Sequence, residues 1–220
     1  EPFSHQRISF DTIYVADPFF SVWPGIACVA LIYLKRRTPR RKKWWRMGLV
    51  LPALYLVYCF LNKAKINSDT KEILQKQQIN YTRYFTTPAP LQNWLWYVVA
   101  GNDSGYYVGF RSLFDSKREI DFEFFPRNDS LLNAVHDHKD LLELIRFSKQ
   151  FYTVEKWSDT LVFNDLRFGQ ILGWQNPQGR FVFHYYLQHP DDNKLVVQRG
   201  RFEGWNGKVF LTLLKRIKGN

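Results

Sequence analysis

The sequence predicts a membrane α-helical hairpin of two transmembrane helices, followed by an α+β extramembrane domain with a mostly antiparallel sheet. Three observations support this prediction. Two segments near the start, residues 18–34 and 47–61, contain no charged side chain. A run rich in Lys and Arg, residues 35–46, separates them. From Thr86 onward, short aromatic and β-branched runs alternate with turn residues, and this pattern is typical of β-strands joined by turns.

Both apolar segments are slightly shorter than the ~20 residues that a spanning helix usually needs. However, aromatic residues and long cations border them, and these can lie at the headgroup level of a bilayer: Trp23, Trp44, Trp45, Tyr58, Lys35, Arg46 and Lys63. Two buried helices of a soluble protein are the alternative. Such helices normally carry a polar face, and neither segment has one. We therefore expect a transmembrane hairpin over residues 18–63.

The basic segment between the two spans indicates their orientation. Eight Lys or Arg lie between Lys35 and Arg46, and without these eight charges the net charge of the chain falls from +11 to +3. A short Lys/Arg-rich loop between spans stays in the cytoplasm. Residues 1–17 and the chain after the hairpin are then extracytoplasmic. The predicted partner is the lipid bilayer and not a nucleic acid, because Trp44 and Trp45 serve better as interface anchors than as base platforms.

A polar segment connects the hairpin to the domain. We expect a linker helix over residues 64–85, in which Asp69 and Glu72 have the spacing of a capping box. This helix is either a new one or a continuation of the second span. Pro88 and Pro90 then end helical character, so the α+β domain is expected over residues 86–220.

The domain is expected to contain an antiparallel sheet interrupted by one helix. The helix is predicted at "DLLELIRFSKQF", where apolar residues recur at helical spacing. The C-terminal "KVFLTLLKRIKG" can form a last strand or a short helix, and we favour the helix. The predicted strands begin near Trp94 and continue at "GYYVGF", "IDFEFF", "FYTVEKW", "TLVFND", "RFVFHYYLQ" and "KLVVQR".

The domain sequence contains few chemical motifs. His136 and His138 in "HDHKD" have the spacing of a metal pair on a strand, yet they lead into a helix, so a solvated helix entry is favoured. His184 and His189 have no cysteine or acidic cluster nearby to complete a metal site. A structural role is about as compatible with them as a role in a site. "GNDSG" indicates a hairpin turn rather than a phosphate loop. No nucleophile elbow and no Ser/His/Asp set is recognisable.

Charged residues before the first span form the remaining candidate site. Arg7, Asp11 and Asp17 lie there, and Asp17 directly precedes Pro18 at the outer entrance of the hairpin. A carboxylate in this place is costly unless it is paired, hydrated or coordinating a cation. A helix-capping Asp before a proline at the first helical position is equally good chemistry. The sequence leaves both interpretations open.

Several motifs in series resemble one known family. "PFS" with Arg7, "IYVADP", the two spans, "INYTRYFTTPAPLQNWLWY", "YYVGFRSLFD", "FSKQFYTV" and "FNDLRFG" are similar to the YdjM-type family of bacterial inner-membrane proteins, described as membrane-bound metal-dependent hydrolases. The resemblance covers nearly the whole chain. It implies a multi-pass protein of the bacterial inner membrane in which a divalent metal ion activates water. Asp17 would be a metal ligand, with Arg7 and Asp11 as less direct contributors beside the metal or the substrate.

The chain opens at Glu1 without Met, so we expect it to be the C-terminal portion of a longer member. The His- and Asp-containing segments of the family are then expected before Glu1, and this chain alone would be inactive. Two functions follow. Either the chain is the C-terminal part of a membrane-bound metal-dependent hydrolase, or it is a membrane-anchored binding or structural module without enzymatic activity.

Overall fold

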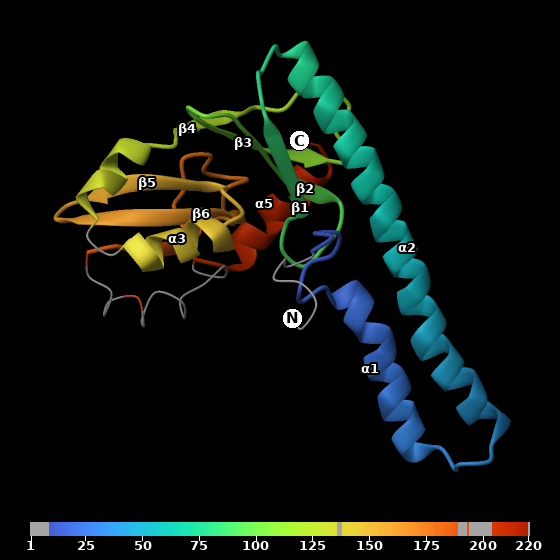
Figure 1. The fold of residues 1–220 in the computed structure, drawn as a ribbon. Helices are drawn as coiled ribbons and strands as arrows, with labels where there is room; N and C mark the ends of the chain where they lie inside the picture. The colour runs from blue at the N-terminus through green and yellow to red at the C-terminus, as the bar shows by residue number, and fades with distance from the viewer. Residues whose placement is uncertain (1–8, 136–137, 189–192, 194–203, 220) are drawn as a thin grey trace.

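The computed structural model describes residues 9–135, 138–188, 193 and 204–219. Figure 1 shows a long helical hairpin and an α+β domain that lies against one end of the longer helix. The predicted order, helices first and then a mostly antiparallel β domain, is confirmed. Arg7, His136, His189, the side chain of His138 and the strand expected at "KLVVQR" lie outside the described part.

Helix α1, Pro18–Tyr33, begins where the sequence places a polar residue followed by proline. The Asp17 backbone is extended, and its side chain accepts hydrogen bonds from the backbone N–H groups of Phe19 and Phe20. Pro18 lies in the first turn, where its missing N–H removes no helical hydrogen bond. At 1.5 Å per residue the 16 residues of α1 span about 24 Å. Asp17 and Pro18 together therefore fix where this short apolar helix starts.

Helix α2, Pro39–Lys76, is 38 residues long and runs without a break from the second apolar segment into the polar segment that follows. Asp69 and Glu72 lie inside it, so the continuation expected as one of two possibilities is the correct one. The helix ends at Lys76, short of the predicted boundary at residue 85. Among the described residues, α2 alone is long and apolar enough to cross a membrane, whereas α1 is a shorter apolar helix.

The two helices run antiparallel and side by side (Figure 1). They lie close together at Gly48 of α2, where an added methyl group would lie 2.5 Å from the Cβ of Ala27. Such contacts between small residues are typical of helix pairs in membranes. At the tip of the hairpin, the Arg41 guanidinium donates to the carbonyls of Leu31 and Leu34, which end α1.

The domain contains two antiparallel sheets in place of the single sheet expected. The first has the order β1-β2-β3-β4 and the second the order β5-β6-β7. Every pair of neighbouring strands is antiparallel. The strands are β1 Arg83–Pro88, β2 Leu95–Gly101, β3 Gly105–Ser112, β4 Glu123–Pro126, β5 Tyr152–Trp157, β6 Thr160–Gln170 and β7 Phe181–Tyr186.

Short helices cover the sheets. The 3-10 helix η1, Asp129–Ala134, and helix α3, His138–Phe147, pack on the second sheet, and α3 confirms the helix predicted there. The C-terminal segment forms helix α5, Gly207–Ile217, as the sequence favoured. Leu213 and Ile217 of α5 pack against Leu95 of the first sheet.

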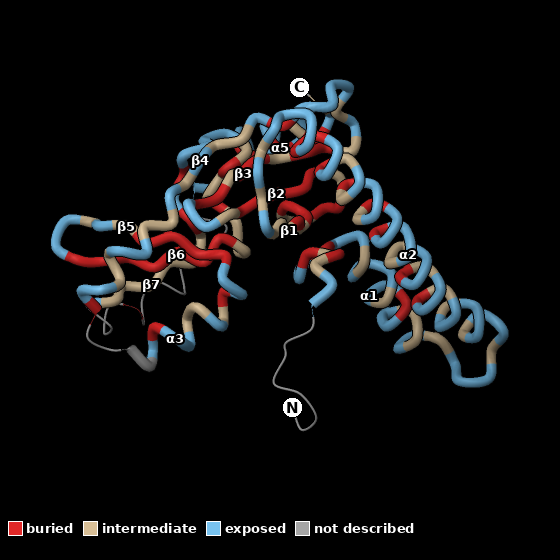
Figure 2. The backbone as a smooth tube through the Cα atoms, turned by 45° about the horizontal axis from the view of Figure 1, so that its top comes forward, coloured by how far each residue is buried: buried red, intermediate tan, exposed pale blue. Residues whose placement is uncertain are grey.

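The core lies between the two sheets. Figure 2 shows β2 and β6 buried over most of their length, with exposed residues at the outer elements. Apolar side chains from both sheets meet there, and they are Tyr97, Val99, Tyr106, Val108, Phe151, Leu166 and Phe181. Because both sheets contribute to this cluster, they form one domain.

Helix α2 has two halves with different surroundings. We call residues 47–61 the apolar half and residues 62–76 the docked half. In the docked half Ile66, Ile73 and Leu74 are buried, and Ile73 packs with Val98 of β2 and with Ile120. The docked half therefore belongs to the core of the domain, whereas the apolar half extends away from it (Figure 1).

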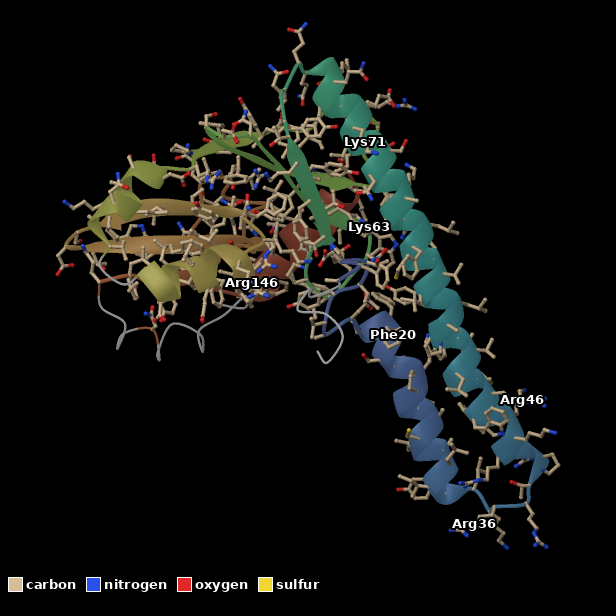
Figure 3. All side chains as sticks on the ribbon, in the orientation of Figure 1. Phe20, Arg36, Arg46, Lys63, Lys71 and Arg146 are labelled. Atoms are coloured by element: carbon tan, nitrogen blue, oxygen red, sulfur yellow. The ribbon has the colours of Figure 1, made fainter. Side chains whose placement is uncertain are left out.

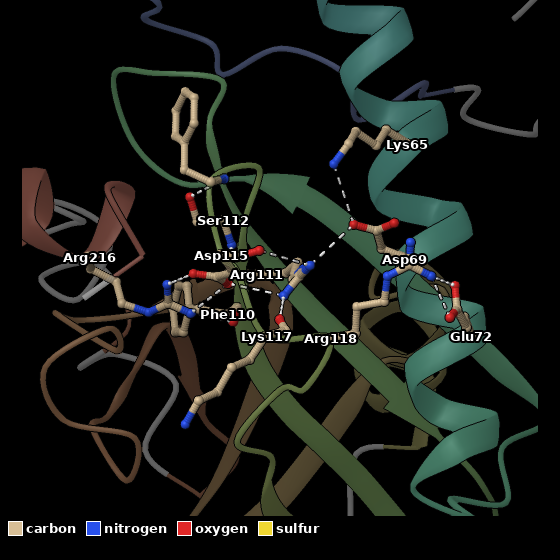
Figure 4. A network of polar contacts seen from close by, with 11 residues as sticks. Lys65, Asp69, Glu72, Phe110, Arg111, Ser112, Asp115, Lys117, Arg118 and Arg216 are labelled. Atoms are coloured by element: carbon tan, nitrogen blue, oxygen red, sulfur yellow. Dashed lines mark hydrogen bonds and ion pairs between the residues drawn. The ribbon is translucent and has the colours of Figure 1, made fainter.

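A polar network ties the docked half to the domain (Figure 4). Arg111 of β3 is 3 % exposed, and its guanidinium lies 3.4 Å from the Asp69 carboxylate of α2 and 3.5 Å from the Asp115 carboxylate. Asp115 also pairs with Arg216 of α5 at 2.7 Å. This chain of charges links α2, the first sheet and the C-terminal helix, so the docked half is held by more than apolar packing.

Candidate functional site

Asp17, the metal ligand that the family resemblance implies, has partners within the hairpin. Its side chain is buried, with 1 % exposed. One carboxylate oxygen accepts the backbone N–H groups of Phe19 at 2.8 Å and Phe20 at 3.3 Å. The other accepts the Tyr55 hydroxyl of α2 at 2.9 Å. Asp17 thus caps α1 and joins it to α2, and both of its oxygens are used.

Asp11 is held elsewhere. Its carboxylate accepts a 2.6 Å hydrogen bond from the Ser9 hydroxyl, and its backbone carbonyl accepts Lys63 of α2 at 3.1 Å. Lys63 also donates to the Thr86 carbonyl of β1 at 2.6 Å. Asp11 and Asp17 therefore have separate partners. Each of them connects the N-terminal part of the chain to α2.

The described residues do not fit a resident metal ion. Nowhere in residues 9–135, 138–188, 193 and 204–219 do three His, Cys, Asp or Glu side chains form a group that could hold one. A catalytic metal centre typically needs about three protein ligands. His184 instead packs against the Trp157 and Tyr186 rings. A metal at Asp17 stays a prediction that requires ligands from outside these residues.

A cleft between the two sheets is the more developed candidate. Its walls are mostly aromatic and apolar, and they include Tyr14, Pro88, Phe110, Phe168, Trp174 and Val182. The cleft is partly open to the surface, and its volume is about 40 Å³, while one water molecule needs roughly 10 to 15 Å³ by the same measure. We call this site the inter-sheet cleft. It lies beside the entrance to α1, because the Tyr14 carbonyl accepts the Asp17 N–H at 3.1 Å.

Arg167, which lines the inter-sheet cleft, is held by a buried carboxylate. Asp165 is fully buried, and Arg167 contacts it through two parallel hydrogen bonds of 3.0 and 2.6 Å. The Arg167 guanidinium also lies over the Phe147 and Phe168 rings. Burial raises the pKa of the Asp165 carboxyl above its ordinary value, and Arg167 opposes that rise. Breaking such a pair is costly because it leaves one buried charge without a partner.

Two residues that line the cleft each carry a buried polar atom without a hydrogen-bond partner. These atoms are the Tyr97 hydroxyl and the Gln170 side-chain carbonyl, on residues that are 2 % and 7 % exposed. A buried polar atom without a partner costs about 1 to 3 kcal/mol. Burial raises the pKa of Tyr97 well above its ordinary value, and the Asp165 charge adds to the rise, so this hydroxyl keeps its proton. Both residues line the cleft, yet these two polar atoms themselves have almost no accessible surface.

The sequence analysis did not single out these residues. Asp165 and Arg167 do carry a signal, because an acid and a base two positions apart share one face of a strand within an apolar run. Tyr97 and Gln170 carry none, since they lie on strands of different sheets. Only the packing of the two sheets brings them to one cleft.

Comparison with known proteins adds no relative. No family model, no curated protein and no solved structure matches this chain. The resemblance to the YdjM-type family therefore remains a prediction from the sequence motifs.

Proposed function

We propose that this chain is a membrane-anchored binding module, in which α1 and α2 cross the bilayer as a hairpin and hold the α+β domain at the extracytoplasmic surface of a bacterial inner membrane. The observation that carries the proposal is the change of surface along α2. Every exposed side chain of the apolar half is uncharged, whereas the exposed side chains of the docked half are polar or charged apart from Ala64. An exposed apolar surface of this size is suited to contact with lipid around the apolar half, and this supports the proposal.

Helix α1 supports the same arrangement. Its exposed side chains include Val22, Ile26, Val29 and Ile32, and it carries no charge. Its roughly 24 Å falls short of the about 30 Å hydrocarbon core, which membranes accommodate by local thinning and by snorkelling of flanking cations. Arg36 and Arg46 lie at the tip of the hairpin and Lys63 at its domain end, so cations flank both ends (Figure 3).

The inter-sheet cleft supports binding as the role of the domain. Apolar walls with a few convergent polar atoms are the usual form of a small-molecule site. The hydrolase hypothesis needs metal ligands that the described residues do not supply. It stays an expectation for a longer protein, whereas the binding role rests on side chains of this chain.

The proposal is tested by the topology of the hairpin. Cys28 and Cys59 are first replaced by Ala, and single cysteines are then placed at Asp103, in the β2–β3 turn, and at Thr38, in the basic loop. A membrane-impermeant maleimide applied to intact spheroplasts should label Asp103→Cys and spare Thr38→Cys until the membrane is opened. Labelling of both in intact spheroplasts, or recovery of the chain in the soluble fraction, would refute the proposed anchoring.

A further inference from the structure

We propose that helix α5 lies on the outer leaflet of the membrane as an interfacial helix, and that it gives the domain a second contact with lipid beside the hairpin. This inference rests on the proposed function, because only a hairpin that spans the membrane brings α5 to its surface. Three properties of α5 support such a contact, and they are its exposed apolar face, its charge and its position next to the start of α1.

Apolar side chains occur on two sides of α5. One side is buried against the domain and is formed by residues spaced four apart, which are Val209, Leu213 and Ile217. Phe210, Leu211 and Leu214 are 46 %, 65 % and 40 % exposed, and their spacing of three and four residues places them on one face. A helix on the surface of a soluble domain normally turns a polar face to water. In α5 an apolar face is uncovered instead.

The charge of α5 complements an anionic surface. Residues 207–219 contain no Asp or Glu. Three lysines of this segment are exposed, and they are Lys208, Lys215 and Lys218. An exposed apolar face combined with lysines is typical of helices that lie in the plane of a bilayer surface. Lysine side chains are long enough to keep their ammonium groups among lipid phosphates while their stems contact apolar surface. The lipid is therefore expected to include anionic phospholipid.

The position of α5 is close to the start of the hairpin. Leu213 and Ile217 pack in one cluster with Trp94. The Trp94 ring lies 5.0 Å from the ring of Phe19, in the first turn of α1. In the proposed arrangement this turn lies at the outer face of the membrane. Figures 1 and 2 both show α5 between the second sheet and the hairpin. One aromatic side chain therefore connects the buried side of α5 to the segment that enters the bilayer.

The size of the exposed apolar face favours lipid over a second copy of the chain. A stable protein interface takes about 20 residues or more from each partner, whereas this face consists of three side chains. Contact with lipid needs no such area, because the hairpin already holds α5 near the membrane and so raises its effective concentration there. A small, basic and apolar face is thus suited to a tethered helix at a lipid surface.

The test places a nitroxide on the full chain in vesicles of phosphatidylcholine and phosphatidylglycerol. Cys28 and Cys59 are replaced by Ala, and the nitroxide is attached to Leu211→Cys. The matched control is Phe124→Cys, an exposed apolar position on β4, which lies away from the start of α1 in Figures 1 and 2. Power-saturation electron paramagnetic resonance measures collisions with oxygen, which dissolves in lipid, and with a water-soluble nickel complex. The ratio of oxygen to nickel collisions should be several-fold higher at position 211 than at position 124, and equal ratios would overturn the proposal.

A second variant tests the apolar face itself. Leu214→Glu places a carboxylate on the same face at an exposed position, so the near-ultraviolet circular dichroism of the domain should be unchanged. The ratio at position 211 should then fall to that at position 124, and a ratio that stays high would show that the face does not contact lipid. Vesicles of phosphatidylcholine alone should also lower the ratio at position 211, and an unchanged ratio would overturn the anionic partner.

Two further outcomes separate this contact from its alternatives. Few collisions with either reagent at position 211, together with dipolar broadening between labelled chains, would show that α5 binds a second copy, and would overturn the contact with lipid. Failure of the anchoring appears separately, in the cysteine labelling at Asp103 and Thr38. A chain that passes this labelling but gives equal collision ratios at positions 211 and 124 refutes the contact of α5 alone.

Discussion

The apolar and docked halves of α2 belong to one continuous helix, yet their exposed sides differ in chemistry. In the docked half the apolar side chains are buried and the exposed ones are mostly Lys, Glu, Gln and Ser. In the apolar half the exposed side chains are Leu49, Val50, Ala53, Leu54, Val57, Tyr58, Phe60 and Leu61. Helix propensity does not distinguish the halves. The difference reflects what each half contacts, which is the protein core in one case and, in our proposal, lipid in the other.

The change occurs over about one helical turn. Tyr58 accepts a 2.9 Å hydrogen bond from the Trp94 indole, and one turn later the buried Asn62 donates to the Asn93 side chain at 3.0 Å. Lys63 then reaches the Thr86 carbonyl. The domain thus forms hydrogen bonds to α2 at the point where the apolar surface of the helix ends. Four substitutions along this helix pair test the comparison, from the largest expected effect to the smallest.

Ile73→Ala should destabilise the domain by about 2 to 5 kcal/mol, because it leaves a cavity between α2 and the first sheet. Ile73 is 1 % exposed. The matched change Val57→Ala, at a side chain that the domain does not cover, should cost less than about 0.5 kcal/mol. Denaturant unfolding followed by near-ultraviolet circular dichroism in nanodiscs measures both. Equal losses would show that the two halves have similar surroundings.

Leu54→Arg should impair membrane insertion by about 2.5 to 3.5 kcal/mol, the usual cost of Arg at the centre of a spanning helix. Ser68→Arg, on the exposed side of the docked half, should insert as wild type. The measurement is the fraction of chain that resists alkaline extraction from membranes. If Leu54→Arg inserts as well as Ser68→Arg does, the apolar half does not lie in lipid.

Asp17→Ala should lower stability by about 1 kcal/mol, because α1 loses its cap. Asp17→Asn should stay close to wild type, since Asn also caps a helix. Metal analysis of the purified wild type and both variants should give equal contents if the role of Asp17 is structural. A 10- to 100-fold weaker metal affinity in Asp17→Asn, the effect typical of losing a partner of a metal ligand, would instead support the hydrolase hypothesis.

Tyr58→Phe should have the smallest effect, about 0.5 kcal/mol, because it removes one partly solvated hydrogen bond at the boundary between the halves. The indole N–H of Trp94 can then bind water in its place. Thermal unfolding of the variant in nanodiscs checks this value. A loss above about 2 kcal/mol would place the boundary inside the buried core rather than at a wet interface.

Much of the fold was predictable because it depends on local patterns. Aromatic alternation identified strands such as β3 and β5, helical spacing identified α3, and Asp17 before Pro18 marked the start of α1. The division into two sheets was not predictable, since no local signal states which strands pair. The candidate site was likewise predictable only where a local pattern marks a residue. Asp17 was visible as an isolated charge, whereas Tyr97 and Gln170 look ordinary in the sequence.

The sequence by itself determined the character of each segment: two uncharged apolar stretches, a basic turn between them and a strand-rich remainder. Periodicity and charge are properties of neighbouring residues, so they can be read without the fold. The tertiary structure alone decided that the polar segment continues α2, that its buried face docks on β2, and that Tyr97, Arg167 and Gln170 line one cleft. These are contacts between residues distant in the chain, and only the packed core brings them together.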